Sequence, residues 1–69
     1  MSEGEFLKSV GSKIRTARKE RNLTLMDIQD KGITGISNMS RIEQGRTNLH
    51  LLTLKKLSDL FQIDIQKLL

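Results

Sequence analysis

Apolar residues recur every three or four positions along most of this chain, which is the spacing of an amphipathic helix. The first such stretch predicts a helix over residues 5–21. Its apolar side consists of Leu7, Val10, Ile14 and Ala17, and Asn22 marks its expected end. Gly11 interrupts the stretch and weakens a helix by about 1 kcal/mol relative to alanine. Its presence therefore indicates close packing against another element.

Two short helices, joined by a turn, are expected next. Thr24 is placed to cap the first, and Asp27 follows three residues later in the spacing of a capping box. Leu25 and Ile28 face inward. Gly32 is expected to end this helix, because glycine accepts the left-handed conformation of a C-terminal cap.

The second of these helices has a buried side and a polar side. Thr34 is its expected N-cap, and Gly45 follows its end. Met39 and Ile42 are three residues apart and share the buried side. The outer side carries Ser37, Asn38 and Arg41. A helix that is hidden on one side and offers small polar groups and an arginine on the other suits the reading of base edges in the major groove.

The last third of the chain predicts two further helices. The apolar positions of the longer one are Leu51, Leu54, Leu57, Leu60 and Phe61. Residues 62–66 alternate between apolar and polar, as in a strand, but no second strand is available to pair with them. We therefore expect a short final helix that is capped by Asp64. The chain is predicted to be an all-α domain of five helices.

Length and composition limit the sources of stability and chemistry. The 69 residues make one domain, residues 1–69, in which residues 1–4 are expected to be a flexible N-terminus. A chain of this length buries only about 60% of its unfolded surface. It has no cysteine, and His50 alone does not build a metal site. Without a nucleophile–base pair or a glycine-rich phosphate loop, we expect no enzyme, no metal, no cofactor and no small-molecule ligand.

The net charge of +4 favours an anionic partner, most simply nucleic acid. Five basic residues lie within nine positions, opposed only by Glu20: Lys13, Arg15, Arg18, Lys19 and Arg21. Such a cluster either contacts phosphates or forms a solvated face. The only aromatic residues, Phe6 and Phe61, are both expected to be buried, which argues against binding of single strands by base stacking.

The sequence contains no apolar run of the roughly 20 residues that a membrane-spanning helix needs. The first six residues are acidic and lack the apolar core of a signal peptide. We therefore expect no membrane partner and a cytoplasmic location.

Three groups of residues, in this order, resemble the lambda-repressor-like helix-turn-helix domain of the Xre/Cro family. They are Gly11-x-x-Ile14-Arg15-x-x-Arg18-x-x-Arg21-Asn22-Leu23-Thr24, Ser40-Arg41-Ile42-Glu43-x-Gly45 and Asn48-x-x-Leu51-x-Thr53-Leu54-x-x-Leu57. The resemblance covers residues 11–69. It implies that the second and third helices form the helix-turn-helix unit and that the third enters the major groove of DNA.

By position, the resemblance implies a set of contacts with double-stranded DNA. The base-reading residues would be Gly35, Ile36, Ser37, Asn38 and Arg41. The phosphate contacts would come from Arg18, Leu25, Arg46, Thr47 and Asn48, with Leu25 acting through the amides at the start of its helix. Arg18 would also form an ion pair with Glu43 that orients the third helix on the first. Members of the family are usually homodimers on operators with two-fold symmetry.

The chain departs from the family pattern around the turn. Gln29 stands where the second helix of the family usually has an alanine. An ungapped match places Ile33 and Thr34 where the family usually has a glycine and an aliphatic residue. These departures predict a remodelled turn and a shift of about one position in the base-reading residues.

The C-terminus carries more apolar residues than a frayed end would: Ile63, Ile65, Leu68 and Leu69. Some are expected to pack on the first helix near Phe6, Leu7 or Val10, and the remainder form a candidate homodimer surface.

The leading hypothesis is a sequence-specific transcriptional regulator that binds double-stranded DNA, acting as a homodimeric repressor on a two-fold symmetric operator. The alternative is a protein-interaction module, such as an antitoxin-like adaptor, that uses the same fold. The apolar residues Leu25 and Ile36 favour the alternative.

Overall fold

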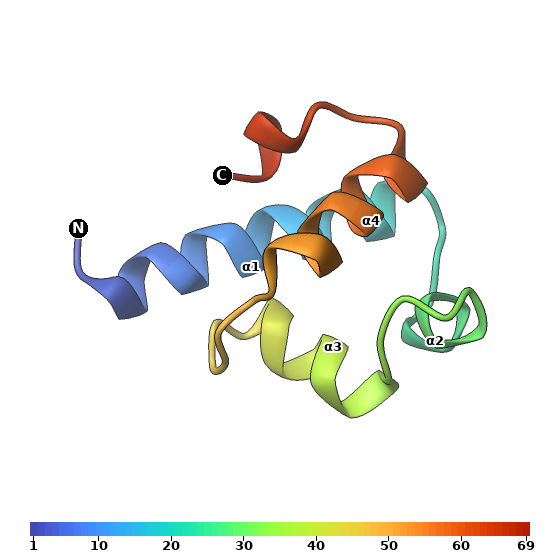
Figure 1. The fold of residues 1–69 in the computed structure, drawn as a ribbon, viewed down its shortest axis with the longest axis horizontal. Coiled ribbons are helices and arrows are strands. Elements are labelled where there is room, and N and C mark those ends of the chain that lie inside the picture. The colour runs from blue at the N-terminus through green and yellow to red at the C-terminus, as the bar shows by residue number, and fades with distance from the viewer.

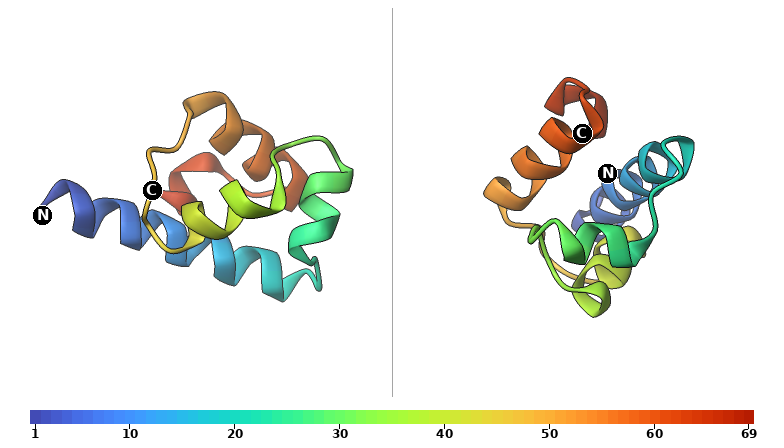
Figure 2. Two further views of the ribbon diagram at one scale, coloured as in Figure 1. Left: turned by 90° about the horizontal axis from the view of Figure 1, so that it is seen from below. Right: turned by 90° about the vertical axis from the view of Figure 1, so that its right-hand side faces the viewer.

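The computed structural model describes residues 1–69 and contains helices but no strand. Its elements are α1 (Glu3–Glu20), α2 (Leu25–Asp30), α3 (Ile36–Glu43), α4 (Leu51–Phe61) and the 3₁₀ helix η1 (Ile65–Leu68). The N-terminal turns of α1 project beyond the other elements, and α2 lies near the opposite end of α1 (Figure 1; Figure 2). No helix has both the length and the apolar character that crossing a bilayer requires. The all-α class is confirmed. Of the five expected helices, four are α-helices, and the last is a short 3₁₀ helix rather than an α-helix.

A capping box sets the start of α1. Ser2 Oγ accepts from the amide of Glu5 at 3.1 Å, and Glu5 Oε1 accepts from the amide of Ser2 at 3.4 Å. The helix therefore begins two residues before the predicted start at Glu5. Glu3 and Gly4, which were expected to lie in a flexible N-terminus, belong to the helix.

The caps of the next two helices differ in kind. Thr24 and Asp27 form the predicted capping box at α2, and Gly32 adopts a positive φ of 73° after its end. The prediction of Thr34 as the N-cap of α3 is wrong, because Gly35 occupies that position with extended backbone angles. The connection between the two helices thus spans residues 31–35, and α3 starts one residue later than predicted.

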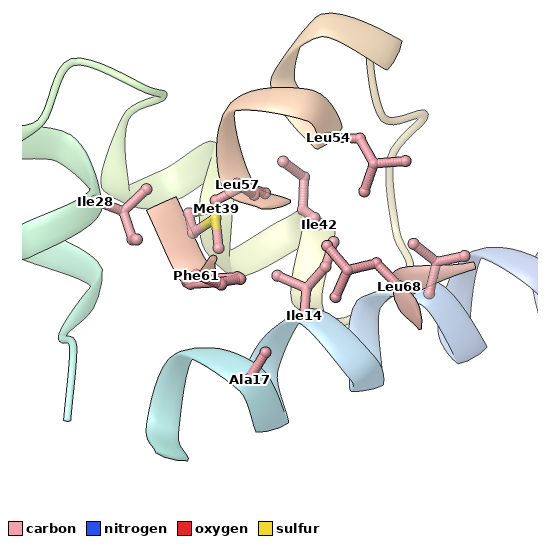
Figure 3. Close-up of a cluster of buried hydrophobic side chains, with 10 residues drawn as sticks. Ile14, Ala17, Ile28, Met39, Ile42, Leu54, Leu57, Phe61 and Leu68 are labelled. Atoms are coloured by element: carbon pink, nitrogen blue, oxygen red, sulfur yellow. The ribbon is translucent and has the colours of Figure 1, made fainter. Parts of the chain in front are cut away.

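One cluster of apolar side chains from all five elements forms the core (Figure 3). Its members are Val10, Ile14, Ala17, Ile28, Met39, Ile42, Leu54, Leu57, Phe61 and Leu68. Two residues that were expected inside are exposed, Phe6 by 44% and Leu51 by 76%. Phe6 lies on the projecting part of α1, and Leu51 lies in the first turn of α4, which the neighbouring elements leave uncovered.

Gly11 explains how closely α1 and α3 approach. A Cβ atom at this position would lie 2.3 Å from the carbonyl oxygen of Ile42 and 2.7 Å from that of Glu43. Both contacts are far shorter than van der Waals distances, so the crossing tolerates only glycine. The close packing that the sequence indicated is therefore packing of α1 against the C-terminal turn of α3.

The C-terminal segment folds back onto the core through η1, which contacts α1 and α4. Asp64 Oδ1 accepts from the amide of Gln66 at 2.9 Å, as expected for its cap. The amide of Lys67 donates to the carbonyl of Asp64 three residues back, which is the pattern of a 3₁₀ helix. A segment this short ends before the longer-range bonds of an α-helix can form.

The four candidate dimer residues differ in how far they are exposed. Leu68 is 1% exposed and belongs to the core, so its assignment to a dimer surface is corrected. Ile63 and Ile65 are half-buried against the core, whereas Leu69 is 47% exposed.

Candidate nucleic-acid interface

The α2–α3 pair forms a compact unit around the connection of residues 31–35. The two helices contact each other, and α3 also contacts α1. Met39 and Ile42 hold the inner side of α3, with 0% and 3% of their surfaces exposed. The outer side of α3 is therefore the one left free for a partner.

Ser37 and Arg41 are exposed on this outer side. They are four residues apart and thus lie one turn from each other on the same face. Arg41 takes part in none of the three ion pairs of the chain. A hydroxyl and a guanidinium group are therefore presented side by side. Of the neighbouring base-reading candidates, Gly35 is exposed and Ile36 is half-buried.

Asn38 has a local role. Its side chain is half-buried, and its Nδ2 donates to Thr34 Oγ1 at 2.8 Å. This bond joins the first turn of α3 to the residue that precedes its N-cap. The amide oxygen of Asn38 has no bond of this kind and remains an acceptor.

A contact that the sequence reasoning missed connects α2 to the start of α3. Gln29 Oε1 accepts a hydrogen bond from the amide of Ile36 at 3.0 Å. The sequence signal was the departure from the small alanine of the family pattern at this position. Spacing along the chain does not reveal the bond, because its partners are seven residues apart.

Arg18 and Glu43, which the resemblance paired, are in bidentate contact. Arg18 Nε donates to Glu43 Oε2 at 2.6 Å, and Nη2 donates to Oε1 at 3.0 Å. The two side chains are 9% and 6% exposed. The hydrogen bond to this carboxylate raises the pKa of Arg18 above its ordinary value. The pair joins α1 to the last residue of α3.

These bonds contradict the second role predicted for Arg18, a contact with a DNA phosphate. Its remaining terminal nitrogen, Nη1, donates to the carbonyl of Leu23 at 2.7 Å. All three nitrogens therefore have partners within the protein, and the side chain is buried. Arg18 is a structural residue.

Arg21 of the basic cluster is also structural. Its Nε donates to the carbonyl of Phe61 at 2.8 Å, and its Nη1 donates to the carbonyl of Ala17 at 2.9 Å. Its guanidinium carbon lies 5.6 Å from the centre of the Phe61 ring. The exposed charge of the cluster thus comes from Lys13, Arg15 and Lys19.

The connection after α3 carries three of the candidate phosphate contacts. Arg46 and Asn48 are exposed, and Thr47 is half-buried. The amide of Arg46 donates to the carbonyl of Arg41 at 2.9 Å, and its Nη1 donates to Gln44 Oε1 at 3.2 Å. These bonds hold Arg46 close to the end of α3.

The fourth candidate, Leu25, is the first residue of α2 and is half-buried. The capping box of Thr24 and Asp27 occupies the amide of Asp27. The first amides of a helix have no partner within it. The amide of Leu25 is therefore the type of donor that a phosphate accepts at a helix start.

Comparison with known proteins agrees with this architecture. Residues 11–69 match the helix-turn-helix domain family. The crystal structure of the DNA-binding domain of BldD is similar over 100% of this chain and 99% of its own, with a TM-score of 0.86 and 27% sequence identity. The BldD DNA-binding domain from S. venezulae matches 94% of this chain and 97% of its own, with a TM-score of 0.83 and 25% identity.

No curated protein matches the chain. The family match includes α2, the connection and α3, and it extends over η1. The resemblance drawn from the sequence is thus confirmed at the level of this domain. The chain belongs to the helix-turn-helix domain family.

Proposed function

We propose that this chain is a sequence-specific regulator of transcription that binds double-stranded DNA through the outer face of α3. The observation that carries the proposal is the pairing of two features on one short helix. Met39 and Ile42 bury its inner side, while Ser37 and Arg41 stand exposed on the outer side. The two similar structures are DNA-binding domains, which supports the same conclusion.

Base reading would be divided among the outer residues of α3. The guanidinium of Arg41 is suited to a bidentate contact with the O6 and N7 atoms of guanine, and the Ser37 hydroxyl suits either a donor or an acceptor. Ile36 offers an apolar contact to a thymine methyl group. Gly35 lets the backbone approach the bases closely, and Asn38 contributes the acceptor that its bond to Thr34 leaves free.

Phosphate contacts would place α3 in the groove. The proposed groups are the side chains of Arg46, Thr47 and Asn48 and the amide of Leu25. Each neutralised phosphate releases counterions, so affinity falls as the salt concentration rises. The exposed lysines and arginine of α1 add to the positive field.

We further propose that the chain acts as a homodimeric repressor that occupies a two-fold symmetric operator. The support for a dimer is apolar surface at the C-terminal side of the molecule. Leu69 is exposed, and Ile65 lines a groove with Lys55 and with Leu51 and Leu52, which are 76% and 64% exposed. Exposed apolar patches of this kind mark contact surfaces. An isologous dimer on this surface would give a palindromic site.

Selection of bound sites from a random duplex library tests the proposal as a whole. We expect a palindromic consensus whose half-sites are separated by about one helical turn. A set of bound duplexes without any consensus would contradict sequence reading.

Variants of Arg41 and Arg46, both exposed, distinguish a base contact from a phosphate contact. We expect Arg41→Ala to weaken binding to the selected duplex about 10- to 100-fold and to relax the preference at one base pair. We expect Arg46→Ala to weaken binding to all duplexes equally and to reduce the slope of log affinity against log salt by about 1. Both are measured by fluorescence anisotropy at several salt concentrations. Equal behaviour of the two variants would argue against a base contact by Arg41.

The exposed residues Leu51 and Leu52 also favour the second candidate, a module that binds another protein through the same fold. The two candidates differ in whether they bind DNA at low salt. A DNA-binding domain binds duplexes of any sequence there through phosphate contacts alone. Failure to retain any duplex in a low-salt gel shift would support the protein-interaction module.

A further inference from the structure

The first amide of α3 donates to a side chain of the neighbouring helix. The first amides of a helix have no partner within it, and an N-cap side chain usually accepts from the second or third of them. The N-cap of α3 is Gly35, which has no side chain. Gln29, in the last turn of α2, supplies the acceptor to Ile36 at 3.0 Å. This hydrogen bond therefore joins the end of one helix to the beginning of the next.

Further side-chain contacts surround this bond. Gln29 Nε2 lies 3.9 Å from the sulfur of Met26, a weak acceptor one turn earlier on α2. Across the connection, the bond from Asn38 to Thr34 ties the first turn of α3 to the residue before its cap. The N-terminal end of α3 is thus positioned by polar side chains.

The C-terminal end of α3 is held by α1 instead. The ion pair of Arg18 and Glu43 and the close crossing at Gly11 both lie at this end. The two ends of α3 therefore have separate supports, one from α1 and one from α2. Since α3 has only eight residues, it depends on such tertiary contacts for its stability.

We propose that Gln29 is a positioning residue for base reading, which holds the N-terminal end of α3 so that Ser37 and Arg41 meet the base edges in a fixed register. This inference rests on the proposed function. Hydrogen bonds to base edges weaken steeply with misalignment. Contacts of Arg46 with the phosphates, at the other end of the helix, do not depend on the bond. Gln29 therefore controls the discrimination between duplexes more than the total affinity.

The test compares Gln29→Met with Gln29→Glu. Methionine keeps the length and helix propensity of glutamine but lacks the strong oxygen acceptor. Glutamate keeps the acceptor and adds a charge that repels every duplex equally. The readouts are the ratio of affinities for the selected and a random duplex, and the hydrogen exchange rate of the Ile36 amide. Gln66→Met, an exposed glutamine-to-methionine change in η1, is the matched control, since η1 does not contact α3.

We expect Gln29→Met to lower the affinity ratio about five- to tenfold, the size of effect that loss of an N-cap has on an equilibrium. The Ile36 amide should exchange faster in this variant. In Gln29→Glu the amide should stay protected, and the ratio should stay within about twofold of the wild type while both affinities fall. Gln66→Met should match the wild type in both readouts.

An unchanged ratio in Gln29→Met would overturn the inference, and so would an equal loss of the ratio in both Gln29 variants. Failure of the proposed function has a different signature, because the wild-type chain itself would then show no preference among duplexes. Hydrogen exchange at Ile36 would still report in that case whether Gln29 holds the start of α3.

Discussion

At the scale of single residues, Arg18 and Glu43 form the one buried ion pair among the three ion pairs of the chain. Three nitrogens of Arg18 bond within the protein, two to Glu43 and one to the carbonyl of Leu23. A carboxylate at the end of a DNA-binding helix would repel phosphates if it were free. Neutralised by Arg18, it anchors α3 on α1 instead.

Removal of Glu43 is therefore expected to be strongly destabilising. Glu43→Ala leaves the buried guanidinium of Arg18 without its counter-charge, and loss of one partner of a buried pair costs about 3–5 kcal/mol. Urea denaturation monitored by circular dichroism measures the change. Glu20→Ala is the control, because its contact with Arg21 is long, at 3.9 Å, and exposed, so a change within about 0.5 kcal/mol is expected. A loss of under about 1 kcal/mol in Glu43→Ala would mean that the pair adds little to stability.

A second residue-scale prediction concerns acid. Hydrogen bonds from the backbone and side chain of Thr24 lower the pKa of Asp27 below its ordinary value. A lowered folded-state pKa contributes stability above the unfolded-state pKa, and this contribution is lost as the pH falls through the folded-state pKa. We therefore expect the wild type to lose stability below about pH 4 more steeply than Asp27→Asn.

Thermal unfolding from neutral to acidic pH measures the two slopes. Asp30→Asn, on the same helix but outside the capping box, is the matched control. Parallel curves for the wild type and Asp27→Asn would show that the capping box does not make stability depend on pH.

At the scale of elements, the position of α3 results from a crossing and two polar contacts. Gly11 brings α1 against the C-terminal turn of α3, where Arg18 also pairs with Glu43. Gln29 connects α2 to the N-terminal turn of α3. A helix of eight residues does not hold its shape alone. The position of the proposed base-reading face thus depends on the helices around it.

The crossing at Gly11 gives the element-scale prediction. Gly11→Ala places a methyl group within 3 Å of the backbone carbonyls of Ile42 and Glu43, so the helices must move apart. Overpacking of this kind costs about 1–3 kcal/mol and exceeds the gain of about 1 kcal/mol in helix propensity. Gly4→Ala, in the same helix with no atom within 4 Å, should leave stability unchanged or raise it. The two variants are compared by urea denaturation, and a stabilised Gly11→Ala would contradict the observed crossing.

At the scale of the whole molecule, the exposed basic residues and the exposed apolar residues have different proposed roles. Arg18 and Arg21 stabilise the fold, so the exposed positive charge comes from other basic residues, among them Arg41 and Arg46. The exposed apolar residues Leu51, Leu52 and Leu69 form the candidate surface for self-association. A small domain with one core gains stability from a partner subunit.

Self-association is the prediction at this scale. We expect sedimentation equilibrium at micromolar concentration to detect a dimer. Leu69→Lys should shift the equilibrium towards the monomer, because it places a charge in an apolar contact. Met26→Lys is the control, since Met26 has a similar exposure of 50% but lies on α2. A wild type that is monomeric at all accessible concentrations would contradict the proposed dimer.

The sequence alone determined what depends on neighbours three or four residues apart. The periodic apolar positions identified the four α-helices and most of their buried sides, and Thr24 with Asp27 identified the start of α2. These features are local, because caps and helix faces follow from the geometry of a single turn. The resemblance added the pairing of Arg18 with Glu43, two residues that local spacing does not connect.

Only the tertiary structure decided which distant groups meet. The core position of Leu68, the exposure of Phe6 and the bond from Gln29 to Ile36 all depend on where separate elements come to lie. The same holds for Arg18, whose nitrogens turn inward to Glu43 and Leu23 although other basic residues of its cluster are exposed. Periodicity along the chain indicates which side of a helix is buried, but the groups that this side meets and bonds are properties of the assembled core.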